Sequence, residues 1–552
     1  MKLVIVGGVA GGASAATRAR RLSEEAEIVL IERGPDVSFA NCGLPYYLGG
    51  EIADRDNLLV AKPALLIHRF RIDVRTSTEV EAIDRGAKLV LVRDLKNGQR
   101  YELPYDKLIL ATGAVPLRPP IPGINLPAVF TMRNLEDVDR IKAVVDQGIT
   151  DAVVVGAGFI GLELAENLVR RGIRTTVVEL QDQVLPPLDR EMTSPIAEQL
   201  RRHGVTLKLG TSAEAFEPSA DGLTVVLKSG DRLHAQLVLL GVGVKPESRL
   251  AAGAGLEIGA KGGVRVDDHM QTSDPDIYAV GDVVEVKSYM SHEPTQIPLA
   301  GPANRQGRIA ADHIFGRESR YRGSQGTAIV RVFNVTAATS GESEKSLQRG
   351  RRTFNKIYVH PNQHAGYYPG AKPMTIKLLF APDDGKLLGA QVVGAEGVDT
   401  RIDILAVALQ TGMTVFDLEE VELAYSPQYG SAKDAINMAG FVASNVLRGD
   451  CPQVYAENLG LPTPAETSTP FLLDVRTPSE FSAGAIPGFS NIPMDDLRAR
   501  LDEVPADREI VVTCQAGQRG YLATRLLIQH GRDAFNLAGG YKTYCLIKDG
   551  GS

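Results

Sequence analysis

The stretch Gly156-Ala157-Gly158-Phe159-Ile160-Gly161 follows the apolar run 152–155 and precedes a helical pattern that extends to about residue 171. In such a Gly-x-Gly-x-x-Gly loop, the first glycine allows a tight turn, and the second lets the backbone approach a pyrophosphate. The third lets the helix pack against the strand. Glu179 ends the next predicted strand, where an acid can bind a ribose 2′-hydroxyl. We therefore predict a parallel βαβ unit that binds a dinucleotide.

The N-terminus repeats this pattern with one departure. The loop Gly7-Gly8-Val9-Ala10-Gly11-Gly12 lies between a predicted strand, 2–6, and a predicted helix, 13–22, and Val9 stands where the second glycine would be. Glu32 ends the following predicted strand with the spacing of a ribose-binding acid. Two such units in one chain predict two bound dinucleotides.

The composition of the whole chain is typical of a soluble protein with several domains. Its 552 residues exceed what one core holds, and 60 Lys and Arg against 67 Asp and Glu give a net charge of −7. This charge gives no reason to expect nucleic acid or an anionic membrane as a partner. Four cysteines, with no Cys-x-x-Cys and no zinc-type Cys/His spacing, predict no metal site and favour a reducing compartment. Because no signal peptide and no membrane-spanning run is recognised, we expect a cytoplasmic protein.

Three segments follow the dinucleotide units. Residues 326–448 mix predicted strands and helices in an α+β pattern. Residues 449–468 are rich in proline, threonine and polar side chains, which is typical of a linker. Residues 469–552 begin with the apolar strand pattern 471–476 and form a compact C-terminal unit.

The order of these motifs resembles the flavoprotein disulfide reductases with two dinucleotide-binding domains. Residues 111–113 resemble the family's link out of the FAD domain, and residues 272–282 resemble its second FAD motif. The resemblance implies an α/β fold with two Rossmann-like, three-layer domains and an α+β dimerisation domain. The implied ranges are 1–113 and 245–325 for FAD, 114–244 for NAD(P)H and 326–448 for dimerisation.

The same resemblance implies two sets of cofactor contacts. For FAD they are Gly7, Gly8, Ala10, Gly11, Gly12, Glu32, Asn41, Ala111, Thr112, Gly113, Gly281, Asp282, Pro298 and Ala300. For NADH or NADPH they are Gly156, Gly158, Phe159, Ile160, Gly161, Glu163, Glu179 and Gly243. The acid at Glu179 favours NADH without settling the choice. Phe159 could cover the flavin and Glu163 could contact the nicotinamide amide, although both positions also suit packing.

Residues 38–43, Ser-Phe-Ala-Asn-Cys-Gly, contain a single cysteine, Cys42. Glutathione- and lipoamide-type reductases carry two cysteines in a Cys-x4-Cys pattern. The single-cysteine string resembles the branch of NADH oxidases, NADH peroxidases and coenzyme A-disulfide reductases, and most closely the last group. A thiolate is the nucleophile of thiol–disulfide exchange, so the chemistry needs Cys42 as a thiolate that forms a mixed disulfide with a small thiol. If Cys42 forms a sulfenic acid instead, the chain is an oxidase or peroxidase.

The coenzyme A branch also implies a substrate site and a homodimer. The implied contacts of coenzyme A are Ser14, Arg18, Arg21, Ser38, Asn41 and Arg305, although the arginines fit a solvated helix face equally well. That branch uses two tyrosines across the dimer interface. Tyr367 and Tyr425 match best, followed by Tyr368 and Tyr429. A phenol can hydrogen-bond a thiolate or protonate a leaving thiolate.

The C-terminal unit resembles a rhodanese domain. Residues 473–476, Leu-Asp-Val-Arg, resemble its first motif, with Ala485 where a histidine is usual, and residues 514–519, Cys-Gln-Ala-Gly-Gln-Arg, resemble its active loop. Backbone N–H groups in such a loop form an anion-binding nest that favours a thiolate and a persulfide at Cys514, and Arg519 adds a positive charge. The alternative is an inactive module that docks partners.

Together these features predict an FAD enzyme that uses NAD(P)H to reduce coenzyme A disulfide, coenzyme A persulfide or polysulfide through Cys42. The rhodanese domain would handle sulfane sulfur at Cys514. An NADH oxidase or peroxidase is the first alternative. A redox-sensing sulfur carrier whose rhodanese domain binds a partner is the second.

Overall fold

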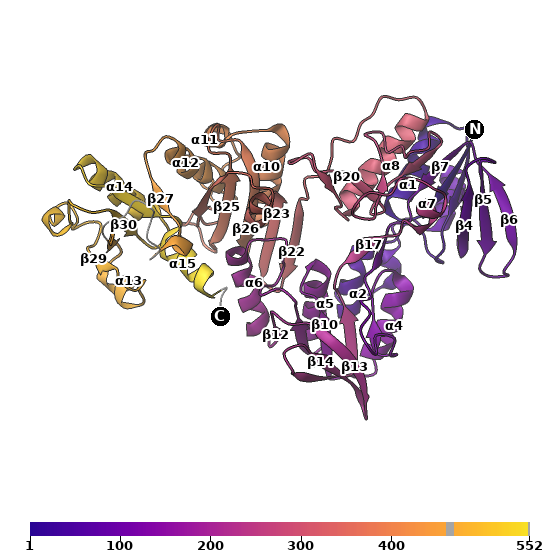
Figure 1. Cartoon of the computed structure of the whole chain (residues 1–552), viewed down its shortest axis with the longest axis horizontal. Helices are drawn as coiled ribbons and strands as arrows, with labels where there is room; N and C mark the ends of the chain where they lie inside the picture. Colours follow the sequence, from indigo (N-terminus) through magenta and orange to yellow (C-terminus); the bar gives the residue numbers. More distant parts are fainter. Residues whose placement is uncertain (460–468, 550–552) are drawn as a thin grey trace. The chain divides into compact units, whose positions relative to one another are not determined.

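The computed structural model describes residues 1–459 and 469–549, and the chain divides into two compact units (Figure 1). Unit 1 takes Met1–Leu180 and Gly204–Gly326, and unit 2 takes Gln181–His203 and Thr327–Ser552. No helix among the described residues is long and apolar enough to cross a bilayer.

The first sheet of unit 1 is parallel, in the order β19-β7-β1-β2-β3. Its strands are β1 (Lys2–Val6), β2 (Glu27–Ile31), β3 (Asp73–Arg75), β7 (Lys107–Leu110) and β19 (Ile277–Ala279). Helix α1 (Ala10–Leu22) packs along α8 (Ala300–Ile314), as Figure 1 shows. The predicted start of this helix at residue 13 was wrong, because the helix already begins inside the glycine loop.

The second sheet of unit 1 repeats this architecture, in the order β12-β11-β10-β16-β9. Its strands are β9 (Val129–Phe130), β10 (Asp151–Val155), β11 (Arg174–Val178), β12 (Thr206–Lys208) and β16 (Leu237–Leu240), and α5 (Phe159–Arg170) follows the second glycine loop. Strands β8 (Ala114–Pro116) and β17 (Val244–Pro246) form an antiparallel pair. They lie at the two predicted boundaries of the NAD(P)H range, 114–244, where the chain leaves the FAD range and returns to it. Both βαβ units predicted from the sequence are therefore present.

Antiparallel sheets accompany both parallel ones. They are β4 (Thr78–Asp84), β5 (Leu89–Asp94) and β6 (Arg100–Pro104); β13 (Ala213–Ser219), β14 (Gly222–Leu227) and β15 (Arg232–Ala235); and β18 (Val264–Arg265), β20 (Val284–Lys287) and β21 (Pro294–Thr295). In the first two sheets, alternate side chains are buried, so each sheet keeps one face toward a core and one toward solvent.

The first part of unit 2 is an antiparallel sheet of order β22-β23-β26-β25-β24. Its strands are β22 (Ala328–Val332), β23 (Val335–Gly341), β24 (Asn355–Val359), β25 (Met374–Phe380) and β26 (Leu387–Gly394), and α10 (Val398–Thr411) contacts β23 and β26. Helix α6 (Arg190–Arg202) lies within the predicted NAD(P)H range but packs with this sheet. Lys377 of β25 explains the difference, because its buried ammonium pairs with Asp189 and Glu191 at the start of α6.

The second part of unit 2 is a parallel sheet of order β27-β31-β30-β28-β29. Its elements are β27 (Gln453–Val454), β28 (Phe471–Asp474), α13 (Pro478–Ser482), β29 (Ser490–Asn491), β30 (Ile510–Thr513), α14 (Gln518–Gln529), β31 (Ala534–Leu537) and α15 (Gly540–Asp549). The linker predicted over 449–468 needs correction, because β27 within it pairs with β31 and Pro452 accepts a hydrogen bond from Asn536. Its residues 460–468 lie outside the described residues.

Candidate active site

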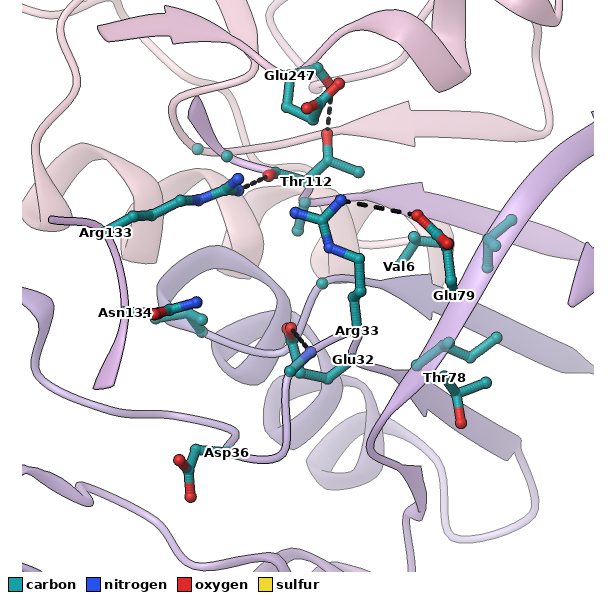
Figure 2. Close-up of a pocket in the computed structure, with 18 of the residues that line it drawn as sticks. Val6, Glu32, Arg33, Asp36, Thr78, Glu79, Thr112, Arg133, Asn134 and Glu247 are labelled. Atoms are coloured by element: carbon teal, nitrogen blue, oxygen red, sulfur yellow. Dashed lines mark hydrogen bonds and ion pairs between the residues drawn. The ribbon is translucent and has the colours of Figure 1, made fainter. Parts of the chain in front are cut away.

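A cavity of about 900 Å³ lies in unit 1 at the carboxyl ends of β1 and β2, where α/β sheets bind ligands. Figure 2 shows Glu32, Arg33, Thr112 and Arg133 around it. Ten residues predicted to bind FAD line it, namely Gly7, Ala10, Gly11, Glu32, Asn41, Ala111, Thr112, Gly113, Gly281 and Asp282. The other four residues predicted to bind FAD belong to the described part of the chain but do not line the cavity, namely Gly8, Gly12, Pro298 and Ala300.

The two glycine loops share the same close backbone approaches. A Cβ atom on Gly12 would lie 1.8 Å from the Gly7 carbonyl oxygen, and one on Gly161 would lie 2.0 Å from that of Gly156. Gly7 and Gly156 both have φ above +100°. Glycine is therefore required at these four positions for steric reasons. Gly7 and Gly156 adopt a positive φ, and any side chain at Gly12 or Gly161 would push the helix off its strand.

The middle positions of the two loops differ. Val9 lines the cavity, whereas a Cβ on Gly158 would meet nothing within 4 Å. The space beside Gly158 is consistent with a ligand that approaches the backbone of the second loop. Gly243, also predicted to bind NAD(P)H, has φ of 106°.

Both predicted acids hold their own glycine loop. Glu32 accepts hydrogen bonds from the backbone N–H groups of Gly8 and Gly34, each at 2.8 Å, while it lines the cavity. The buried carboxylate of Glu179 accepts one from Ala157 at 2.7 Å. The acids therefore order the loops, and contact with a ribose stays a prediction.

The sequence missed several charged residues of the cavity, chiefly Arg133 and Glu247. Arg133 Nη2 donates to the Thr112 carbonyl at 2.9 Å, and Thr112 Oγ1 donates to the Glu247 carbonyl at 2.7 Å (Figure 2). Burial raises the pKa of the Asp282 carboxyl, and the charge of Arg133 opposes that rise. Arg133 precedes the capped start of α4 (Leu135–Val145), a signal for a helix but not for a cavity wall.

Cys42 lies in a short 3₁₀ helix, Asn41–Gly43, directly before α2 (Leu44–Gly49), and the residue is exposed. Asn41 Oδ1 accepts a hydrogen bond from the Cys42 backbone N–H at 3.1 Å. Partial burial of the thiol raises the pKa of Cys42, and the carboxylates of Glu163 and Asp282 raise it further. Burial and these two carboxylates therefore oppose the thiolate that the chemistry needs at Cys42, whereas a hydrogen bond from the backbone favours it.

Helix α5 brings the predicted nicotinamide residues close to the Cys42 segment. Glu163 accepts a hydrogen bond from Tyr46 of α2 at 3.0 Å, and burial raises the pKa of its carboxyl. Phe159 begins the helix and is half-buried, whereas Ile160 is exposed. A ligand that reaches from the second loop toward Cys42 would pass Phe159 and Glu163.

Of the residues predicted to contact coenzyme A, Ser14, Arg18 and Arg21 lie on α1 and Arg305 lies on α8, which packs along it. Ser14 Oγ donates to Asn304, and Arg18 Nη2 pairs with Asp312 at 2.6 Å. Arg21 and Arg305 are exposed, and Ser38 has φ of +48°. Arg18 is thus paired within the seam, and its contact with a coenzyme A phosphate stays a prediction.

The two tyrosines ranked first by the sequence meet in unit 2. The hydroxyl groups of Tyr367 and Tyr425 lie 2.9 Å apart, although 58 residues separate them. Both side chains are exposed, at 76% and 50% of their accessible area. Their mutual hydrogen bond raises the pKa of Tyr367. Tyr368 and Tyr429 are also exposed and lie outside this hydrogen bond.

The active loop predicted around Cys514 folds back so that its backbone contacts the Cys514 sulfur. Cys514 is buried at the end of β30, and its Sγ accepts a hydrogen bond from the Gly517 backbone N–H at 3.1 Å. Gly517 has φ of +95° and precedes α14, and this conformation turns its N–H toward the sulfur. Behind the loop, Tyr541 N–H donates to the Cys514 carbonyl at 2.8 Å.

Comparisons with known proteins agree with this arrangement. Residues 1–307 match the model of the pyridine nucleotide-disulphide oxidoreductase family, and residues 327–435 match the dimerisation domain of that family. The chain belongs to the pyridine nucleotide-disulphide oxidoreductases. Residues 456–546 match the rhodanese-like domain. The predicted fold class and family are therefore confirmed.

Relatives of this oxidoreductase cover its length. The coenzyme A disulfide reductase of Staphylococcus aureus (strain JH9) is 36% identical over 444 residues, which is 80% of this chain and 99% of that protein. The reduced CoADR-RHD of Bacillus anthracis superposes with a TM-score of 0.96 at 46% identity, covering 99% of this chain and 98% of the other. The NAD-dependent persulfide reductase of A. fulgidus gives 0.91 at 37%, covering 99% and 100%.

Proposed function

We propose that this oxidoreductase uses NAD(P)H and FAD to reduce coenzyme A disulfide, coenzyme A persulfide or polysulfide through Cys42. The observation that carries the proposal is one exposed cysteine beside a dinucleotide-sized cavity, with no other cysteine before residue 451. Without a resolving cysteine, the substrate must supply the second sulfur. The names of the Staphylococcus and A. fulgidus relatives support this substrate class.

The residues of the cavity fit FAD. The glycine cradle of Gly7 and Gly12 leaves the start of α1 free for a pyrophosphate, and Glu32 lies where an adenosine ribose would end. Asn41 and Asp282 would hold the flavin end beside Cys42. When bound there, FAD supplies a two-electron relay between the nicotinamide and a disulfide. Glu179, Gly158 and Glu163 would hold NADH or NADPH, and the acid at Glu179 supports NADH.

The proposed reaction at Cys42 needs only the sulfur substrate and NAD(P)H. The Cys42 thiolate attacks the inner sulfur of a persulfide R–S–SH, a Cys42–S–S–R bond forms, and hydrosulfide leaves with the electron pair of the broken bond. Two electrons from NAD(P)H then return Cys42 and R–S⁻ as thiolates. With coenzyme A disulfide, the first leaving group is coenzyme A thiolate instead.

We further propose that the enzyme works as a homodimer in the cytoplasm. Its dimerisation-type domain supports the pairing, and the bonded hydroxyls of Tyr367 and Tyr425 would cross the interface to protonate or hold the leaving thiolate. Four free cysteines suit a reducing compartment. Cys514 would accept or deliver sulfane sulfur for the reductase site.

Mass spectrometry of the Cys42 peptide from purified, non-reduced protein tests the proposal. We expect a coenzyme A adduct that disappears on addition of NADH, and we expect Cys42→Ser to abolish persulfide reduction. Cys545→Ser, which changes a cysteine outside the proposed sites, serves as the control. Sulfenic acid at Cys42 without a thiol adduct, together with fast oxygen uptake, would identify an oxidase or peroxidase instead.

A further inference from the structure

The guanidinium of Arg519 is paired with a carboxylate rather than free. Arg519, in the first turn of α14, donates from Nη1 and Nη2 to the two carboxylate oxygens of Glu480 at 2.8 and 2.7 Å. This is the bidentate geometry that makes arginine–carboxylate pairs strong. The sequence led us to expect that Arg519 adds a positive charge to the active loop, and in the structure Glu480 of α13 offsets that charge.

The pair lies beside the sulfur-binding loop. Arg476 Nη1 donates to the Glu480 carbonyl at 3.2 Å and to Gln515 Oε1 of the loop at 3.3 Å, which ties α13 to the loop. The side chains of Arg519 and Glu480 remain 34% and 32% exposed, so a molecule that approaches the loop meets them. The hydrogen bonds from Arg519 lower the pKa of Glu480 to about 2, so its charge persists at neutral pH.

We propose that Glu480 determines the donor specificity of the Cys514 site by cancelling the charge of Arg519. The site then favours donors whose reacting sulfur group carries one negative charge, as in the R–S–S⁻ group of thiol persulfides, over thiosulfate, whose reacting group carries two. This inference rests on the sulfur-handling role proposed above for Cys514. It follows because backbone dipoles alone compensate a second negative charge less well than a full cation does.

Both donors transfer sulfur to Cys514 by the same bond changes, and only the charge of the leaving group differs. The Cys514 thiolate attacks the terminal sulfur of R–S–S⁻, a new S–S bond forms, the donor S–S bond breaks, and R–S⁻ leaves with its electron pair. No net oxidation or reduction occurs. From thiosulfate, the leaving group is sulfite, so two negative charges must approach the thiolate and then depart from its persulfide.

Glu480→Gln tests the inference in the full-length holoenzyme, because glutamine keeps the capping-box bonds that Glu480 makes with Thr477 but carries no charge. We expect kcat/KM for thiosulfate, with cyanide as acceptor, to rise on the order of fivefold. The value for glutathione persulfide should stay within about twofold. Adding Arg519→Gln should remove the gain. Glu503→Gln is the matched control, since Glu503 makes the same two-bond pair with Arg500 elsewhere in the domain.

A second readout is independent of the sulfur substrate. The rates at which iodoacetate and iodoacetamide alkylate Cys514 differ only through the charge of the reagent, and their ratio can be measured on the Cys514 peptide. Glu480→Gln should raise the iodoacetate-to-iodoacetamide ratio, and an unchanged ratio would overturn the inference even in an active persulfide reductase. A raised ratio without sulfur transfer from either donor would overturn the proposed role of Cys514 and the specificity assigned to Glu480.

Discussion

Two carboxylates add to the effect of burial on the pKa of the Cys42 thiol. Glu163 and Asp282 both add to the rise in the pKa of Cys42 that begins with partial burial of the thiol. These residues come from α5 and from the turn after β19, so each dinucleotide-binding part of unit 1 contributes one charge near Cys42. A bound cofactor or an arriving substrate can therefore change the fraction of thiolate by changing this charge balance.

Removing one of these charges should make Cys42 more reactive. In Glu163→Gln the pKa of Cys42 should fall, because the thiolate no longer faces that carboxylate. Iodoacetamide should then alkylate Cys42 at pH 7 about two- to fivefold faster, since more thiolate is present. Mass spectrometry of the Cys42 peptide across pH measures this shift. Glu136→Gln, at the cavity wall, is the control; equal rates in the two variants would contradict the assignment.

The tyrosine pair gives a second test at the residue scale. Tyr425→Phe removes one hydroxyl of the Tyr367–Tyr425 hydrogen bond, and kcat for the disulfide substrate should fall by about 10- to 100-fold, in line with loss of a proton donor. Tyr429→Phe removes an exposed hydroxyl outside the pair and should leave steady-state turnover unchanged. If both variants turn over alike, the pair has no role in proton transfer.

At the scale of elements, the two βαβ units use glycine for different reasons within one loop. Gly161 has no room for a side chain because of the Gly156 carbonyl, whereas Gly158 faces open space with an extended φ of −75°. The third glycine therefore serves the fold, and the second serves a ligand. The sequence located both loops, but it placed the start of α1 too late because glycines inside the first turn look like loop.

This division predicts opposite outcomes for two alanine substitutions. Gly161→Ala should destabilise unit 1 by about 1–3 kcal/mol, because the new Cβ meets a backbone oxygen that cannot move aside. Gly158→Ala should keep the melting temperature of the native protein and raise the KM for NADH, since the methyl group occupies the space of the pyrophosphate. Thermal unfolding and NADH kinetics separate the two effects. Loss of stability in Gly158→Ala would refute the ligand role.

At the scale of the whole molecule, buried polar groups join segments that the sequence keeps apart. Lys377 of β25 pairs with Asp189 at 2.9 Å and with Glu191 and Glu344 at 2.6 Å each. Burial by itself would lower the pKa of Lys377, but Tyr358 and the three carboxylates raise it well above its ordinary value. The three acids therefore surround an ammonium group, which occupies the place that a cation could take.

A second buried contact joins the rhodanese-like domain to the antiparallel sheet. His360 lies 2.9 Å from Thr543 of α15 and 3.0 Å from Thr375 of β25, and burial lowers the pKa of His360 to about 3. A Cβ on Gly540 would lie 2.3 Å from the Cys514 carbonyl, so the start of α15 touches the active loop directly. The loop thus rests on a helix that is itself held by the sheet.

Substitution of Lys377 tests how much the buried cluster contributes to folding. Lys377→Met leaves three carboxylates without a counter-charge and should lower the free energy of unfolding by about 3–5 kcal/mol at pH 7. Because the folded-state pKa of Lys377 is raised, this contribution is complete below the unfolded value of about 10.4 and is lost as pH rises through the folded value. Lys372→Met, which breaks the exposed pair with Glu396, should leave urea denaturation unchanged; equal losses would contradict the prediction.

The sequence by itself determined the βαβ units, their loops, the lone Cys42 and the Cys514 loop, because these depend on local periodicity and on short-range spacing. Only the tertiary structure decided the contacts that depend on long-range packing. It placed Arg133 in the cavity wall, paired Arg519 with Glu480, joined β27 to β31 and drew α6 to Lys377. Charge pairing and strand pairing select partners by distance in space, and neither leaves a periodic signal in the chain.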